Sequence, residues 1–234
     1  MNQSFTDKEL GLIEIRRNPR ARRCILRLKA DRVLLTVPAG VSYEKAIGFL
    51  NEKRDWVLAH KDTVQRPPRI ISAENPMKAL TFSLNIQSSP RKNILFSLQN
   101  GVLNVLYPQT EMVESDKMQG KIRQGIEAAL RFEAKRILPE KLNQLSRQHH
   151  LPFSGVKIQQ SKTRWGSCSS RKSINLSYFL LLLPEHLIDY VLLHELSHTV
   201  EMNHSPRFWA LLDRLTGGQA KILAKEIKQY RTGF

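Results

Sequence analysis

The sequence predicts an α+β protein with a β-rich N-terminal part, residues 1–112, and a mainly helical C-terminal part, residues 113–234. Short β-type runs separated by turn residues dominate the first part. From about Ser115 onward, apolar residues recur at helical spacing. The chain has 234 residues, 41% of them hydrophobic, which suffices for a sizeable core in one large domain or two small ones.

The N-terminal part contains two predicted hairpins with a helix between them. Segment 22–40 has the pattern of two strands joined by a turn. Ser42 can cap a helix that extends to about Lys61, and the QRPPR segment, residues 65–69, ends that helix and opens a linker. A second hairpin is predicted at Asn100-Gly101, because Asn-Gly between two apolar runs is the strongest short hairpin signal.

The C-terminal part begins with a long predicted helix, which Pro139 is expected to kink or restart. A strand pair is expected next, formed by GVKIQQSKTRW and INLSYFLLL around the turn-forming GSCSSRKS, and this pattern places Cys168 in the turn. Pro184 then starts another helix, since its missing N–H costs nothing at the first helical position.

The composition indicates which kind of partner the protein binds and in which cellular compartment it works. Lys and Arg number 37 against 21 for Asp and Glu, a net charge of +16. This excess favours a polyanionic partner, although a basic enzyme would have the same composition. Cys24 and Cys168 form no CxxC pair, and no secretory leader is recognisable, so a cytoplasmic protein is expected. The longest apolar run, residues 178–184, is too short to span a bilayer.

A basic run from Arg16 to Lys29, RRNPRARRCILRLK, contains seven basic residues and no acidic one. As a strand, it would place its charges in alternation on one face. Two interpretations stay open at this point: a solvated face of the sheet, or a phosphate-binding patch that contacts nucleic acid.

The segment HELSHTVEMNHSPRFW, residues 194–209, carries the strongest chemical signal. His194 and His198 are four residues apart, so both imidazoles project from one face of a helix. With Glu195 they form the HExxH arrangement, in which two histidines bind zinc and the carboxylate reaches the water molecule bound to the metal. The alternative is an amphipathic helix with solvated histidines.

A third ligand is expected just after this helix. Asn203 can adopt the left-handed turn that ends the helix, and Ser205-Pro206 can start the next one. His204 would then lie in a bend from which it reaches the metal. Glu201 is the rival ligand, because it follows His198 by three residues on the same face. Alternatively, Glu201 could hydrogen-bond to a metal-binding side chain without binding the metal itself. Three protein ligands leave a fourth position for water, as in catalytic zinc sites.

These motifs carry a resemblance to a known family. The run SKTRWGSCSSRKSINLSYFLLLLP and the helix LIDYVLLHELSHTVEMNHSPRFW resemble the YgjP-like metallopeptidases, and RRNPRARRCILRL, VLLTVPAG and FLNEKRDWVLAH fit the same pattern. The similarity extends more distantly to SprT-like and WLM-type proteases. It implies a zincin-like domain with an active-site helix, a backing helix and a small sheet whose edge lies along the cleft. It also implies that His194, His198 and His204 bind Zn²⁺ and that Glu195 is the general base.

The resemblance leaves the substrate open. Peptide-bond hydrolysis is the leading hypothesis. Some members of the family are described as nucleotide pyrophosphatases acting on UTP, so cleavage of a nucleoside triphosphate is the alternative. A third hypothesis is a nucleic-acid-associated protein with a structural metal site, although such a site would not need Glu195 as a base.

Three further residues, Arg164, Trp165 and Asn175, also match the family's pattern and are expected to contact substrate. The strand around them could pair with an extended peptide. Arg164 could instead hold a phosphate or a developing oxyanion. A tight hairpin with a packed indole is the structural alternative.

Overall fold

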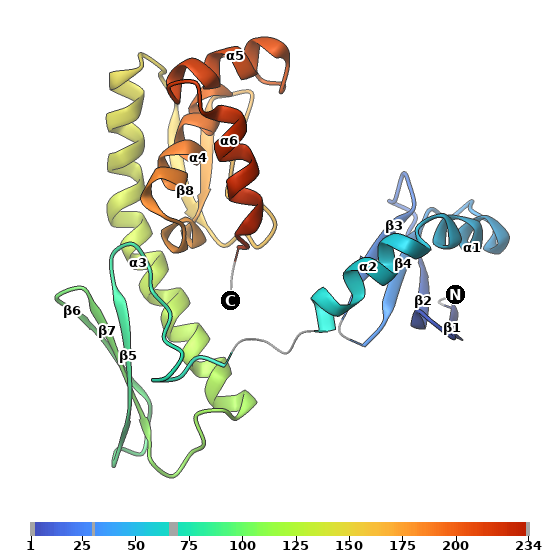
Figure 1. The fold of residues 1–234 in the computed structure, drawn as a ribbon, viewed down its shortest axis with the longest axis horizontal. Helices are drawn as coiled ribbons and strands as arrows, with labels where there is room; N and C mark the ends of the chain where they lie inside the picture. The colour runs from blue at the N-terminus through green and yellow to red at the C-terminus, as the bar shows by residue number, and fades with distance from the viewer. Residues whose placement is uncertain (1–2, 30, 66–69, 233–234) are drawn as a thin grey trace. The chain divides into compact units, whose positions relative to one another are not determined.

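The computed structural model describes residues 3–29, 31–65 and 70–232. The chain forms two compact units, Met1–Pro68 and Arg69–Phe234, each with its own strands and helices (Figure 1). Of the predicted linker, residues 66–69 lie outside the described part of the chain. Both units mix helices and sheets, which confirms the α+β class.

The division between the units lies before the second predicted hairpin and not near residue 112. Gln119, a buried residue of the long helix, binds the main chain of Ile71 twice: Ile71 N donates to Oε1 and Nε2 donates to Ile71 O, each at 2.9 Å. Buried side chains of the hairpin, such as Leu103 and Val105, join one hydrophobic core with that helix. The change of periodicity near residue 112 therefore marks a change of element within one unit.

The N-terminal unit is a four-stranded sheet covered by two helices. Its strands follow the order β1-β2-β4-β3, and its elements are β1 (Gln3–Asp7), β2 (Gly11–Arg17), β3 (Ile25–Leu28), β4 (Val33–Val37), α1 (Tyr43–Glu52) and α2 (Arg54–Gln65). The antiparallel β3–β4 pair confirms the first predicted hairpin. The β1–β2 hairpin was not anticipated, and β2 pairs with β4 in parallel. One face of the sheet packs with Leu50 and Val57 of the helices in a shared core.

The predicted helix after Ser42 is present but is divided. Ser42 caps α1 by accepting a hydrogen bond from Lys45 N, and α1 ends at the cap residue Lys53. The first residue of α2, Arg54, donates to Asp7 at the end of β1 at 2.6 Å, which ties α2 to the first hairpin. This long-range contact belongs to the tertiary structure, so the local pattern did not predict the division.

The basic run 16–29 is not one strand, so the expected alternation of charge along it is wrong. Arg17 ends β2 and β3 begins at Ile25. Asn18 accepts a hydrogen bond from Arg20 N at 2.9 Å, which forms a turn, and Pro19 offers no N–H for a strand ladder. The basic residues are therefore spread over two strands and the loop that joins them.

The C-terminal unit contains two sheets and the longest helix. Its elements are β5 (Ser83–Ser89), β6 (Leu95–Gln99), β7 (Val102–Pro108), α3 (Asp116–Gln148), β8 (Gly155–Gln159), β9 (Gly166–Cys168), β10 (Ser173–Ser177), the 3₁₀ helix η1 (Tyr178–Leu182), α4 (Glu185–Ser197), α5 (Pro206–Leu215), α6 (Ala220–Glu226) and the 3₁₀ helix η2 (Ile227–Gln229). Strands β6 and β7 meet at Asn100-Gly101, where both residues have positive φ, 49° and 72°, so the second predicted hairpin is confirmed.

Helix α3 connects the two sheets of this unit (Figure 1). Ser115 caps it as predicted, but the helix is not restarted at Pro139 and continues for 33 residues. Its N-terminal half packs closely on the first sheet, because a Cβ added at Gly125 would lie 2.0 Å from the ring of Phe96. Its later turns contact β8, η1 and α4, so α3 is the backing helix of the region that carries the histidines.

The second sheet has the strand order β8-β10-β9, with β8 and β10 parallel and β9 and β10 antiparallel. The sequence predicted a pair of strands here, and the structure has a sheet of three. Cys168 belongs to β9 and not to a turn. The residues GSC, 166–168, pair with the edge of β10 that faces away from β8. Both Cys24 and Cys168 are free thiols. Across the described ranges, no helix has the length and apolarity needed to cross a membrane.

Candidate metal centre

The three histidines of the predicted zinc site come together. His194 and His198 lie at the C-terminal end of α4, and His204 lies in the segment between α4 and α5. One ring nitrogen from each lies within 4.8 Å of those of the other two. His204 Nε2 is 3.0 Å from His194 Nε2. Two nitrogen ligands of a tetrahedral zinc ion are roughly 3.3 Å apart. The spacing fits one shared metal ion.

The bend that carries the third histidine forms differently from the prediction. Asn203 does not have a positive φ, so the expected left-handed turn at this residue is wrong. Instead, Glu201 N donates to Ser197 O at 2.9 Å and turns the chain at the helix end. Ser205 then caps α5 as predicted, accepting from Phe208 N at 3.3 Å. The bend is fixed on both sides by hydrogen bonds, which hold His204 opposite α4.

Phe208 forms a shared floor under the histidines, and sequence reasoning missed it. Its ring centroid lies 4.9, 4.6 and 4.7 Å from those of His194, His198 and His204. The side chain is fully buried. Its position four residues after His204, on the first turn of the next helix, was the available signal. Such packing restricts the ring orientations and preorganises a ligand set.

Two of the three imidazoles, those of His194 and His198, are shifted toward the neutral form that binds metals. Burial, with smaller contributions from His198 and His204, lowers the pKa of His194 to about 3. Burial also lowers the pKa of His198, against the opposing effect of its contact with the Glu201 carbonyl. His198 Nδ1 lies 3.1 Å from that carbonyl oxygen and can donate to it, which leaves Nε2 for a metal. The part of Glu201 that contributes is therefore its main chain, and its carboxylate is not in the ligand cluster.

Glu195 lies beside the histidines as a buried carboxylate. Glu195 is only 5% exposed. Among the described residues, its Oε2 atom has no hydrogen-bond partner. Burial raises the pKa of Glu195 to about 8, although the charge of Arg164 opposes this rise. Gly166 of β9 makes the space for it, because a Cβ at this position would lie 2.6 Å from Glu195 Oε1.

The three expected substrate contacts are placed differently from one another. Arg164 is exposed and close enough for its charge to act on Glu195. Trp165 is half-buried against the core, and its carbonyl accepts from Ser177 N at 2.8 Å. Asn175 pairs with Ser167 across β9 and β10, one position along from Gly166. Because side chains alternate along a strand, Asn175 points to the face of the sheet away from Glu195. This register does not support Asn175 as a substrate contact.

The segment 160–165, here called the Arg164 loop, is anchored to α3 by Glu127, which sequence reasoning also missed. Glu127 Oε2 accepts hydrogen bonds from Tyr178 Oη at 2.7 Å and Gln160 Nε2 at 2.8 Å. Lys162 Nζ lies 3.5 Å from Glu127 Oε1. One carboxylate of the backing helix thus holds the loop that presents Arg164.

The YgjP-like metallopeptidase domain matches residues 22–230 of this chain. The chain belongs to the YgjP-like family. Among solved structures it is similar to two metallopeptidase zymogens, each at 23% identity. Abylysin of Pyrococcus abyssi matches with a TM-score of 0.37, covering 42% of this chain and 100% of that one. Jannalysin of Methanocaldococcus jannaschii matches with a TM-score of 0.35, covering 39% and 93%. No curated protein matches the sequence.

Proposed function

We propose that this YgjP-like chain is a zinc-dependent peptidase. His194, His198 and His204 would hold the metal, and Glu195 would be the general base. The observation that carries the proposal is the convergence of three imidazoles next to a buried carboxylate, one oxygen of which has no hydrogen-bond partner among the described residues. Burial of polar groups without partners costs free energy, and a bound metal with its water would provide those partners.

The protein residues around the histidines suit peptide hydrolysis. Zinc, when bound, would supply a Lewis acid that acidifies water and polarises a carbonyl oxygen. Glu195 would accept the proton of the attacking water and pass it to the leaving amine. Arg164 would face the charge that develops on the substrate oxygen. Strand β9 ends the sheet order, so its free edge could pair with an extended substrate.

Of the two alternatives, only nucleotide hydrolysis has a specific observation in its favour. Hydrolysis of a nucleoside triphosphate would use the same histidines and Glu195, and the exposed Arg164 could bind a phosphate group. A purely structural metal site would fit a basic, nucleic-acid-associated protein. Structural zinc sites normally have four protein ligands and need no base, so the cluster of three histidines beside Glu195 weighs against it.

The substrate class is tested with the purified chain, an unfolded protein and a panel of nucleoside triphosphates, each with and without a zinc chelator. We expect cleavage of the unfolded protein that stops with the chelator and returns with added zinc. Turnover of nucleotides without proteolysis would favour the pyrophosphatase alternative, and an Arg164→Ala variant should then raise the KM for the nucleotide. Inactivity of the zinc-loaded chain on both classes would overturn the hydrolase proposal.

The role of Glu195 is tested by a Glu195→Gln variant. Glutamine keeps the shape of the side chain but cannot accept the proton, so we expect kcat to fall about 10²–10⁴-fold. Zinc content should stay at the wild-type level, because Glu195 is outside the ligand cluster. Glu201→Gln is the matched control and should keep its activity. Full activity in Glu195→Gln, or loss of its metal, would refute the assignment.

A further inference from the structure

We propose that the open face of the N-terminal sheet binds the phosphate backbone of a nucleic-acid duplex. This basic face is the side of the sheet opposite α1 and α2, together with the loop between β2 and β3. Its basic members are Arg16, Arg20, Arg22, Arg23, Arg27, Lys29 and Arg32. The proposal concerns a second activity of the chain and does not depend on the function of the histidines.

Strand register assigns the side chains on β2 and β3, Arg16 and Arg27, to the open face. Glu14 of β2, Leu34 of β4 and Arg27 of β3 lie side by side across the sheet. Their neighbours Ile13 and Val33 are buried in the core shared with the helices. Because side chains alternate along a strand, the row that contains Arg27 must point the other way. The same alternation places Arg16 on this open side.

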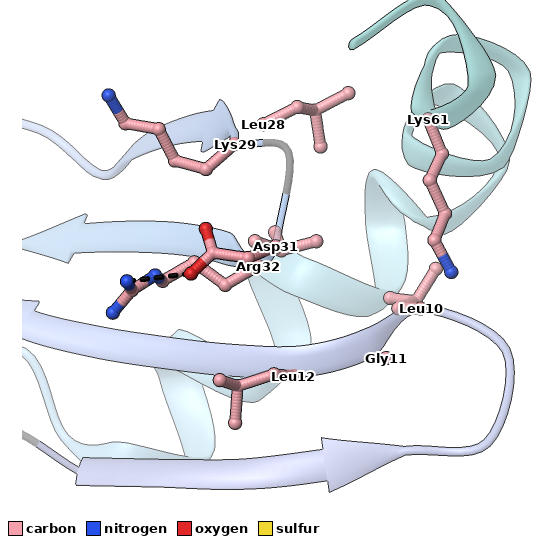
Figure 2. Close-up of a pocket in the computed structure, with 9 residues that line it drawn as sticks. Leu10, Gly11, Leu12, Leu28, Lys29, Asp31, Arg32 and Lys61 are labelled. Carbon is pink, nitrogen blue, oxygen red and sulfur yellow. Dashed lines mark ion pairs between the residues drawn. The ribbon is translucent and has the colours of Figure 1, made fainter. Parts of the chain in front are cut away.

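The basic face is hollowed. A cavity of about 500 Å³ is lined by Glu14, Arg16, Arg27, Lys29, Asp31, Arg32 and Leu34. A smaller hollow of about 70 Å³ borders it at the end of the strands, toward the helix side, where Lys61 of α2 is part of its lining, and the two hollows share Lys29, Asp31 and Arg32 (Figure 2). In this view Asp31 and Arg32 are paired, while the amino group of Lys29 lies apart from both (Figure 2).

Most of the positive charge on this face is available to a ligand. The acidic residues Glu14 and Asp31 are paired with Arg16 and Arg32, at 2.7–3.0 Å. The remaining basic side chains are exposed and form no ion pair within the described residues: Arg20, Arg22, Arg23, Arg27 and Lys29. Arg27 and Lys29 are two residues apart along the edge of the sheet, so their Cα atoms are roughly 7 Å apart. A row of phosphates matches such a row of cations.

The chemistry of the face favours a duplex over a single strand. Proteins that bind single strands without sequence preference stack the bases on aromatic side chains. The described residues of the open face include no aromatic ring, and Phe5 packs edge-on against Tyr43 with the helices at 6.4 Å. Contact would therefore be with the backbone, independent of sequence and strongly dependent on salt.

The experiment measures binding of the full chain to fluorescent duplexes of two unrelated sequences over a range of salt concentrations. We expect equal affinity for both sequences and a linear fall of log K with log salt. The variant Arg27→Ala/Lys29→Ala should weaken binding and reduce the steepness of that slope by about 2, since each lost phosphate contact removes about 0.9. Duplex RNA should behave like duplex DNA, because the contacted backbone is a phosphodiester in both.

The matched control is Lys45→Ala/Lys53→Ala, which removes two exposed cations from the helix side of the same unit. It should leave the slope unchanged. The proposal is overturned if the control lowers the slope as much as the variant, or if the chain binds no duplex at low salt. Tighter binding to single strands than to duplexes, or to anionic phosphatidylserine vesicles, would also overturn it. Circular dichroism and zinc content confirm that each variant is folded.

Discussion

At the scale of single residues, Gly166 decides whether Glu195 can occupy its place. The carboxylate lies where a side chain of residue 166 would begin, 2.6 Å from an added Cβ. We predict that Gly166→Ala displaces the carboxylate or β9 and lowers kcat/KM by about 10²-fold, since a misplacement of about 1 Å has effects of this size. The overpacking should also cost about 1–3 kcal/mol of stability. Zinc content should be unchanged, because Gly166 is outside the histidine cluster.

Gly155→Ala is the control for that variant. Gly155 lies in β8 of the same sheet, and an added Cβ would meet no atom within 4 Å. Kinetics, elemental analysis and thermal unfolding of both variants provide the comparison. Equal activity in Gly166→Ala and Gly155→Ala would show that the close approach to Glu195 has no catalytic importance.

The sequence predicted which residues carry the chemistry better than how they are held. The spacing of His194, His198 and His204 was sufficient to predict their convergence, because helix geometry and a following bend are local properties. Gly166 and Phe208 could not be assigned in the same way. Gly166 acts through a contact between β9 and α4, which are separate in the chain, and Phe208 acts through a ring packing that its residue type alone does not distinguish from ordinary helical core packing.

At the scale of elements, the Arg164 loop depends on Glu127 of α3. We predict that Glu127→Gln loosens the loop. The substitution removes the negative charge next to Lys162 and replaces one oxygen of the carboxylate that accepts from Tyr178 and Gln160 with an NH₂ group. Arg164 would then be presented less accurately, and kcat/KM should fall by about 10-fold with zinc content unchanged. Because Glu127 is proposed as a positioning residue, hydrogen exchange of residues 160–165 should also increase.

Glu140→Gln is the control for this prediction, since it removes an exposed carboxylate from the same helix. It should change neither the exchange of the loop nor the kinetics. Unchanged exchange and kinetics in Glu127→Gln would contradict the positioning role. A loss of zinc in that variant would instead indicate a general effect on the fold of the unit.

Elements with local signals were predicted correctly, and those that depend on distant partners were not. The Asn100-Gly101 hairpin and the caps at Ser115 and Ser205 follow from turn and capping chemistry within a few residues. The parallel pairing of β8 with β10 and the contact of Arg54 with Asp7, next to the division of the helix at Lys53, join segments that are not adjacent in the chain. Periodicity has no information on which strand lies next to which.

At the scale of the whole molecule, the described residues form two separate hydrophobic cores, one in each unit. We predict that a fragment of residues 69–234 folds and binds zinc. A fragment of residues 113–234 should be unstable, because α3 would lose the cover that β5–β7 provide for Met118, Ile122 and Ile126. Exposure of each such side chain costs about 1.5–3 kcal/mol. Thermal unfolding and zinc binding of the two fragments measure the difference, and equal stability would place the boundary near residue 112 after all.

Zinc stoichiometry in the full chain tests most directly whether the three histidines form the metal site. We predict about one zinc ion per chain in the wild type, as three ligands around one ion require. His204→Ala should lose the metal, because the remaining pair of histidines cannot complete the set. Glu201→Ala should retain it, since only the main chain of Glu201 contacts His198. Wild-type zinc content in His204→Ala together with its loss in Glu201→Ala would contradict the site described here.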